Sequence, residues 1–361
     1  MPKKNKVTTR DIAREAGLSQ STVSMILSGR KDLKFTPETV ERVKNTADRL
    51  HYHYEKKSTK KENRSKDTIL IMCPSLSSQY YTTLIQVITE YAQKQNLHTL
   101  IAHTSRSAEI EEYYLHLAAE SRFYGVIYTY PAKAIDLINR LSKKHSFVMI
   151  NDYNPELHVG FIEFDSKKSG KLMGRHLIEL GHRQVAYMTT PLSKSEFPRI
   201  RRLEGLKEAF LEAGLGANSV EVYALTEDQW NHQLLGNRYY DAGYQLVMAN
   251  RTKLKKETTA FVGTNDLVSI GILDALTTLG YSVPKDYSVC GFDNTLASKF
   301  SGISLTTIDH CIDTKGKDAV DMLISQRKHL TLENQEVPAP LMRLEYQPQL
   351  LIRNSTGPCK K

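Results

Sequence analysis

The chain has 361 residues and a formal net charge of +9, all of which lies near its N-terminus. Residues 1–66 contain 17 Lys and Arg against 8 Asp and Glu, whereas residues 67–361 contain 32 of each. The length allows two or three domains, and the asymmetry predicts a small basic module joined to a neutral body. No run approaches 18 apolar residues and no apolar segment follows the basic N-terminus, which argues against a transmembrane helix or secretory signal and favours a cytoplasmic protein.

Metal and disulfide chemistry find no support in the cysteine pattern. The four cysteines lie far apart and form no CxxC pair, so we expect neither a disulfide framework nor a zinc site. No cofactor is expected.

Residues 1–50 predict three short helices in chain order. Thr8 is a good N-cap with Asp11 three residues later, and Gly17 supplies the turn that ends the first helix. Ser19 caps the second helix, and Thr36-Pro37 begins the third. Two helices joined by so short a turn predict a helix-turn-helix, whose second helix enters the DNA major groove.

The start of the second helix carries the side chains that would contact DNA. The predicted base contacts are Gln20, Ser21, Thr22 and Met25. The predicted phosphate contacts are Thr8, Ser19, Ser24 and Arg30. A three-helix protein-interaction domain with solvated basic faces is the alternative, and the segregated charge favours DNA.

Residues 51–67 are polar and Lys-rich, which is typical of a linker. Two interpretations compete here. In one the linker is an electrostatic hinge that follows phosphates, and in the other it is a disordered tether; we favour the first slightly. The hinge interpretation assigns DNA contact to Lys56, Lys57, Lys60 and Lys61.

From Thr68 onward, short apolar runs alternate with helical patterns, which predicts parallel, doubly wound sheets. The predicted strands are Ile69–Cys73, Thr99–Ala102, Gly125–Tyr128, Phe147–Ile150, Val185–Met188, Val220–Tyr223, Ala260–Val262 and Ser288–Gly291. The predicted helices are Leu84–Lys94, Ile110–Ala119, Lys167–Leu180, Leu203–Ala213, Tyr239–Asn250 and Leu267–Leu279. We expect two α/β lobes over residues 68–352, a tail at 353–361, and a ligand cleft between the lobes.

Residues 11–24 read DIAREAGLSQSTVS and closely resemble the N-terminal signature of the lactose/galactose-repressor (LacI/GalR) family of bacterial regulators. Blocks around His176–His182, Asn265-Asp266 and Gly291–Asn294 resemble the family's effector domain, so the resemblance covers residues 7–52 and about 68–325. It implies a periplasmic-binding-protein-like fold with three crossovers between lobes. The sequence departs from the family at several positions, among them Met25, where arginine is common, and Lys61, where a hinge leucine wedges into the minor groove.

The predicted effector residues follow strands. Asn265 and Asp293 come directly after apolar runs, and Arg202 is expected to start the helix after Val185–Met188. Spacing alone favours capping roles, with Asp266 the better cap of its helix, whereas the resemblance assigns Arg202, Asn265 and Asp293 to effector hydroxyls. Tyr80 and Tyr81 are weaker candidates for stacking on a sugar ring.

Enzyme motifs such as GxGxxG, HExxH and GxSxG are missing from the sequence. Glu111-Glu112 are expected on a polar helix face, and His176 and His182 are expected to cap a helix end.

The sequence therefore predicts a transcription regulator, by family default a repressor, that binds a pseudopalindromic operator as a homodimer or higher oligomer. Its small effector is expected to be a carbohydrate. The alternatives are a sugar-binding or sugar-processing protein with a non-specific basic head, and a regulator with a degenerate pocket that answers to a protein partner.

Overall fold

The computed structural model divides the chain into two compact units, Met1–Arg64 (unit 1) and Ser65–Lys361 (unit 2). The residues that the structure describes are 7–28, 35–50, 52, 67–121, 123–192, 197–232, 236–252, 257–331 and 341–360.

Unit 1 contains three short helices. They are α1 (Thr9–Ala16), α2 (Gln20–Leu27) and α3 (Pro37–Arg49). The Asp11 carboxylate accepts from the amide and the hydroxyl of Thr8 at 2.9 and 2.7 Å, and the Ser19 hydroxyl accepts from the Thr22 amide at 3.1 Å. Gly17 has φ 65°, a conformation that costs other residues energy. Both predicted caps and the helix-turn-helix are therefore confirmed.

Unit 2 has two lobes, each built on a six-stranded sheet. The first sheet has the order β11-β5-β4-β3-β1-β2 and is parallel throughout. Its strands are β1 (Thr68–Cys73), β2 (His98–His103), β3 (Gly125–Tyr128), β4 (Phe147–Ile150), β5 (Gly160–Phe164) and β11 (Arg343–Tyr346). Its helices are α4 (Gln79–Lys94), α5 (Ala108–Ser121), α6 (Ile135–Leu141) and α12 (Ile312–Thr331).

Helices cover both faces of the first sheet, and the two-residue period of β1 shows how. Leu70 and Met72 join the core beneath α5 and α6. Ile69 and Ile71 join the core beneath α4 and α12. Because both faces are buried, the strand is an unbroken apolar run, as expected for parallel sheets.

The second sheet has the order β12-β10-β9-β8-β6-β7, and only the β10–β12 pair is antiparallel. Its strands are β6 (Val185–Thr189), β7 (Val220–Ala224), β8 (Ala260–Gly263), β9 (Ser288–Phe292), β10 (Thr306–Asp309) and β12 (Gln349–Leu351). Its α-helices are α7 (Ser166–Glu179), α8 (Phe197–Glu212), α9 (Glu227–Asn231), α10 (Arg238–Asn250) and α11 (Asp266–Thr278). The described residues of this lobe also include two 3-10 turns, Ala217–Ser219 and Ala297–Lys299.

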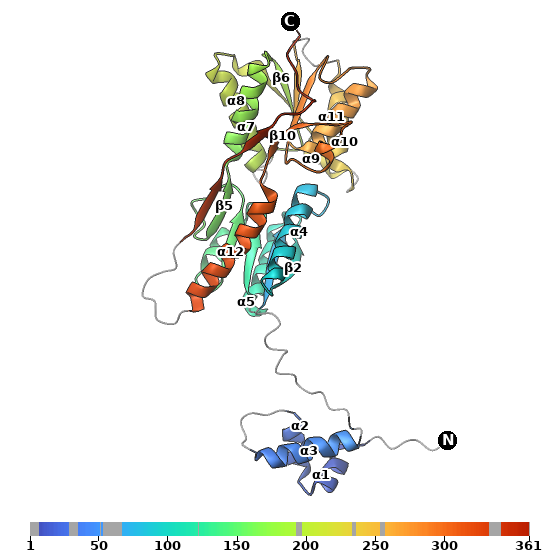
Figure 1. Cartoon of the computed structure of the whole chain (residues 1–361), viewed down its shortest axis with the longest axis vertical. Helices are drawn as coiled ribbons and strands as arrows, with labels where there is room; N and C mark the ends of the chain where they lie inside the picture. The colour runs from blue at the N-terminus through green and yellow to red at the C-terminus, as the bar shows by residue number, and fades with distance from the viewer. Residues whose placement is uncertain are drawn as a thin grey trace, which may run out of the picture. The chain divides into compact units, whose positions relative to one another are not determined.

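The chain passes three times from one lobe to the other (Figure 1). These passages follow β5, β10 and β11, so both lobes combine early and late segments. In Figure 1 the dark-red strands near the C-terminus run alongside both lobes. The three crossovers agree with the family resemblance, and the late strands β11 and β12 were not predicted from the sequence.

The segment 353–360, which the sequence predicts as a tail, packs against the second lobe. The Ser355 hydroxyl donates to the Val289 carbonyl at 2.6 Å and accepts from the Thr306 amide at 2.8 Å. His176 and His182 also belong to this packing instead of capping a helix end. His176 bonds the Thr356 hydroxyl at 3.0 Å, and His182 bonds the hydroxyls of Thr259 and Ser288.

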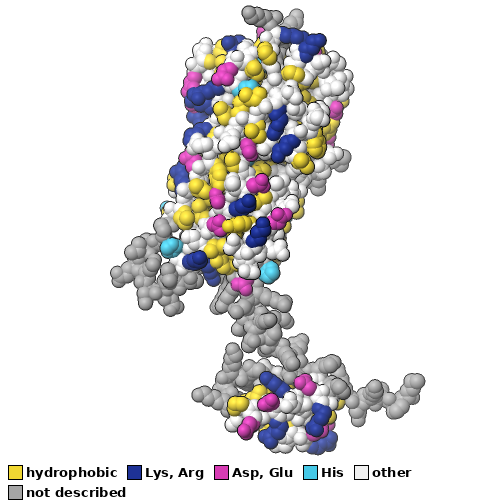
Figure 2. All heavy atoms as spheres, viewed as in Figure 1, with side chains coloured by type: hydrophobic (Ala, Val, Ile, Leu, Met, Phe, Trp, Pro, Cys, Tyr) yellow, Lys and Arg dark blue, Asp and Glu magenta, His cyan; other side chains and the backbone are white. Residues whose placement is uncertain are grey.

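Charged side chains of both signs are mixed over the visible face of unit 2 (Figure 2). This distribution agrees with the equal numbers of basic and acidic residues after residue 66. Among the described residues, no helix is long and apolar enough to cross a membrane.

Candidate functional site

A pocket lies between the two lobes of unit 2, where parallel strands of both sheets end. Its walls come from the segments after β1, β3, β4 and β5 in the first lobe and after β8 and β9 in the second. α8, α10, the start of α12 and the segments after β2 and β10 also contribute to the lining. All five predicted effector residues line this pocket: Arg202, Asn265, Asp293, Tyr80 and Tyr81.

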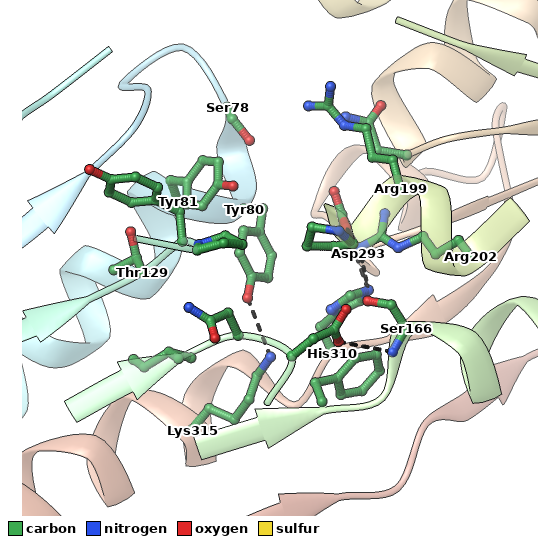
Figure 3. A pocket seen from close by; sticks show the side chains of 18 of the residues that line it. Ser78, Tyr80, Tyr81, Thr129, Ser166, Arg199, Arg202, Asp293, His310 and Lys315 are labelled. Atoms are coloured by element: carbon green, nitrogen blue, oxygen red, sulfur yellow. Dashed lines mark hydrogen bonds and ion pairs between the residues drawn. The ribbon is translucent and has the colours of Figure 1, made fainter. Parts of the chain in front are cut away.

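Arg202 is the centre of a buried polar network on the second lobe. Its guanidinium donates to the Thr264 carbonyl at 2.7 Å and to His310 Nε2 at 3.2 Å, and it lies 3.6 Å from the Asp293 carboxylate. Figure 3 shows Arg202, Asp293 and His310 grouped on one side of the pocket. Arg202 lies within α8, which already includes Phe197, so the expectation that it starts that helix is wrong.

The adjacent residues Asn265 and Asp266 have different roles: Asn265 caps α11, whereas spacing favours Asp266 as the cap. Asn265 is the N-cap of α11, and its side chain accepts from the Val268 amide at 2.9 Å. Asp266 is fully buried and accepts from the Thr295 amide and the Thr307 hydroxyl at 2.7 and 2.6 Å. The prediction that Asp266 caps the helix is therefore wrong, because its side chain bonds Thr295 in the loop after β9 and Thr307 in β10.

Asp293 has φ 117° and directs its carboxylate to Arg202 and His310, each 3.6 Å away. A helix-capping role, which spacing alone favours, does not match this arrangement. Burial raises the pKa of Asp293 to about 6, against the opposing effect of the neighbouring Arg202. Burial also lowers the pKa of His310 well below its usual value, so the imidazole is neutral near pH 7.

Aromatic rings form the first-lobe side of the pocket (Figure 3). Tyr80 and Tyr81 meet edge to face at 5.1 Å, and the Tyr81 hydroxyl accepts from Arg106 at 3.0 Å. Tyr239 lines the pocket from α10 of the second lobe, and its hydroxyl accepts from Arg199 at 3.1 Å. The aromatic side chains of Tyr153, Trp230 and Tyr240 are not part of the pocket lining.

Glu111 supports the pocket wall from inside the first lobe. It is fully buried, and its carboxylate accepts from the Tyr130 hydroxyl at 3.0 Å and from the amides of Lys133 and Ala134 at 2.9 and 2.8 Å. The expectation that Glu111 lies on a polar face is therefore wrong, whereas its neighbour Glu112 is exposed. A loop 20 residues away supplies the donors, so no local pattern reveals this role.

Several buried polar atoms of the pocket have no hydrogen-bond partner among the described residues. They are Nδ2 of Asn151, Oδ2 of Asp152 and Nε of Arg202. Burial raises the pKa of Asp152 to about 6, while a bond from the Ser166 amide at 3.1 Å opposes the rise. Buried polar groups are nearly always paired, so donors and an acceptor left open in one pocket favour a polar ligand.

Sequence reasoning missed several pocket residues that carry charge or can do so: Arg106, Asp152, Arg199, His310 and Lys315. Lys315 belongs to α12, which was not predicted as a helix, and it is 1% exposed. No pattern near residue 315 distinguishes a buried lysine from a solvated one.

In unit 1, the described DNA-contact candidates lie along α2 and at its N-cap, except for Thr8, which is the N-cap of α1. Thr8, Ser19, Gln20, Ser21 and Ser24 are exposed. Thr22 and Met25 are half-buried. Gln20 bonds side chains of α1, accepting from Arg10 and donating to Thr9 at 3.2 Å each. Arg30, Lys56, Lys57, Lys60 and Lys61 fall outside the described residues.

Comparisons with known proteins identify both units. Residues 8–54 match the family described as bacterial regulatory proteins, lacI family. Residues 175–356 match the periplasmic binding protein-like domain. The chain belongs to the LacI family of bacterial regulatory proteins. It is a DNA-binding transcription regulator with a small-molecule effector domain, and not an enzyme.

Individual transcription regulators are similar over most or nearly all of the chain. The transcriptional repressor PurR of Haemophilus influenzae (strain PittEE) is 27% identical over 352 residues, which covers 96% of this chain and 98% of PurR. The structure of a LacI family regulator from Enterococcus faecium with bound ribose has TM-score 0.67 and 24% identity. The match covers 81% of this chain and 100% of the Enterococcus chain. The regulator CelR in complex with cellobiose has TM-score 0.63 and 21% identity. The match covers 97% of this chain and 99% of the CelR chain. These similarities confirm the predicted fold class.

Proposed function

We propose that this LacI-family regulator responds to a carbohydrate that binds between the lobes of unit 2. The observation that carries the proposal is the convergence of Arg202, Asn265 and Asp293 on one pocket. Figure 3 shows Arg202 and Asp293 opposite the rings of Tyr80 and Tyr81. An arginine donates, a carboxylate accepts and an amide does both, which suits a polyhydroxylated ligand, and tyrosine rings stack on sugar faces. The ribose and cellobiose in the two similar structures support the same ligand class.

The proposed effector acts through linkage between the two lobes. A ligand that contacts both lobes stabilises one of their relative arrangements, because it binds that arrangement more tightly than the others. We propose that this arrangement changes the affinity for operator DNA, and that effector binding relieves repression, which is the default in the family.

We propose that the operator contacts are Gln20, Ser21, Thr22 and Met25 for bases and Thr8, Ser19, Ser24 and Arg30 for phosphates. Lys56, Lys57, Lys60 and Lys61 would add phosphate contacts from a linker at residues 51–67, between a DNA-binding domain at 1–50 and an effector domain from residue 68. One helix-turn-helix reads one half-site, so the proposal includes a cytoplasmic homodimer on a pseudopalindromic operator.

Calorimetric titration of the full chain with neutral monosaccharides, disaccharides, sugar phosphates and sugar acids tests the effector proposal. The variant Arg202→Ala should abolish binding of whichever compound binds the natural chain. Arg201→Ala is the matched control, because Arg201 immediately precedes Arg202 on α8. Its side chain pairs with Glu204 at 3.5 Å and does not line the pocket. Equal loss in both variants, or unchanged binding in Arg202→Ala, would contradict the assigned site.

A further inference from the structure

Lys315 is a fully buried cation at the pocket wall. Its side chain is 1% exposed, and its ammonium donates to the Tyr80 hydroxyl at 3.3 Å. The ammonium also lies 4.8 Å from the centre of the Phe164 ring and 5.5 Å from that of Tyr80. Figure 3 shows Lys315 reaching from α12 toward the Tyr80 hydroxyl.

No carboxylate of the described residues forms an ion pair with this ammonium, and Asp293 of the same pocket is paired with Arg202 instead. Burying an ammonium group without an opposite charge costs several kcal/mol. Burial accordingly lowers the pKa of Lys315 to about 8. The Tyr80 hydroxyl and the two aromatic rings offset only part of this cost. The Lys315 ammonium therefore lacks a counter-ion among the described residues.

The charges of the whole pocket show the same imbalance. The described lining holds the four cationic side chains Arg106, Arg199, Arg202 and Lys315, against the carboxyls of Asp152 and Asp293. The lining also contains the buried Nδ2 of Asn151, a further donor without a partner among the described residues. A neutral sugar would leave the Lys315 ammonium without a counter-ion among the described residues.

We propose that the effector carries an anionic group, a phosphoryl or a carboxylate, and that Lys315 with the Tyr80 hydroxyl binds it. This inference rests on the proposed function and narrows it from carbohydrates in general to sugar phosphates or sugar acids. The hydroxyls of such a ligand would remain for Arg202, Asn265 and Asp293, and its anionic group would supply the missing counter-ion of Lys315.

The test compares matched ligands on the full chain by calorimetry: glucose, glucose 6-phosphate and glucuronate, then ribose, ribose 5-phosphate and ribonate, with inorganic phosphate alone. At least one anionic compound should bind more tightly than its neutral parent. Lys315→Met should weaken the binding of that anionic compound by about 10- to 100-fold, as expected for losing a hydrogen bond between charged groups. The same variant should leave the affinity for the neutral parent compound unchanged. Lys317→Met, an exposed lysine of the same helix, is the control.

A second measurement needs no ligand. Because Lys315→Met removes an unpaired buried charge, it should raise the melting temperature of the ligand-free chain, whereas Lys317→Met should not. A lower melting temperature for Lys315→Met would mean that the lysine stabilises the fold, and would overturn the inference.

The ligand panel separates failure of the inference from failure of the proposed function. Binding of a neutral sugar without any preference for anionic compounds would overturn the inference and leave the carbohydrate effector in place. Binding of nothing in the panel would contradict both. Tighter binding of the phosphate esters would identify the anionic group as a phosphoryl, and tighter binding of the sugar acids would identify it as a carboxylate.

Discussion

The substitution Gly205→Ala tests how the contact between α7 and α8 positions Arg202. A Cβ added at Gly205 would lie 1.9 Å from the carbonyl oxygen of Lys167 and 2.9 Å from the amide nitrogen of Lys171, both in α7. Neither is the flexible end of a side chain, so the two helices must move apart. Arg202 lies one turn earlier on α8, and its 2.7 Å bond to the Thr264 carbonyl depends on that helix position.

The expected cost follows from the size of this clash. Ordinary contacts begin near 3.4 Å, so a 1.9 Å approach requires a movement greater than 1 Å in a closely packed region. Overpacking of this kind costs about 1–3 kcal/mol, occasionally more. For a domain of this size, each kcal/mol lowers the melting temperature by about 2–4 °C, so we expect a loss of about 2–12 °C.

Tryptophan fluorescence during thermal unfolding measures this effect in unit 2 alone, because Trp230 is the single tryptophan of the chain and packs on Tyr239 at 5.1 Å. Gly216→Ala is the control, since Gly216 has φ −67° and no atom within 4 Å of an added Cβ. We expect the control to change stability by less than about 0.5 kcal/mol. Equal melting temperatures for the two variants would refute the account of close helix packing.

Three further predictions test the site and the linker. Glu111→Ala should destabilise unit 2 by about 3 kcal/mol or more in urea unfolding, because it leaves three donors without their acceptor, while Glu112→Ala at the exposed neighbour should be nearly neutral. Burial raises the pKa of Asp152 above its unfolded value, so this carboxyl favours folding below about pH 4 and that contribution is lost as pH rises through about 6. The stability of Asp152→Asn relative to the natural chain should therefore be greater at pH 7.5 than at pH 5, and the opposite order would contradict the burial of this carboxyl. Replacing the four lysines assigned to DNA contact in residues 51–67 with alanine should lower the salt dependence of operator affinity by about 0.9 in the log–log slope for each lost phosphate contact. Loss of operator preference instead would indicate a hinge that reads bases.

Local patterns in the sequence predict the elements whose signal is complete within a few residues. The strands of the first sheet at Gly125–Tyr128 and Phe147–Ile150 are short apolar runs, and their predicted bounds agree with the structure. β5 was missed because Glu163 interrupts its apolar run. That carboxylate is 8% exposed and accepts from Arg343 Nε at 2.6 Å, a partner 180 residues away on β11.

The pocket residues divide in the same way. Arg202, Asn265 and Asp293 could be assigned because they lie in motifs that the family shares. Glu111 and Lys315 could not, because their burial depends on a distant loop and on a helix that joins the first lobe only after the chain has passed through the second. The pairing of such charges is decided by tertiary packing, which a pattern of neighbouring residues does not contain.

Sequencing of DNA retained by the full chain from a randomised duplex library tests the central claim most directly. A LacI-family regulator that reads DNA through α2 should enrich two inverted copies of one short half-site at fixed spacing. In the Gln20→Ala chain, the base preference should weaken at one position of each half-site while the spacing stays the same. Retention of library DNA without any enriched sequence, at an affinity set by salt alone, would contradict sequence-specific regulation and indicate a non-specific basic head.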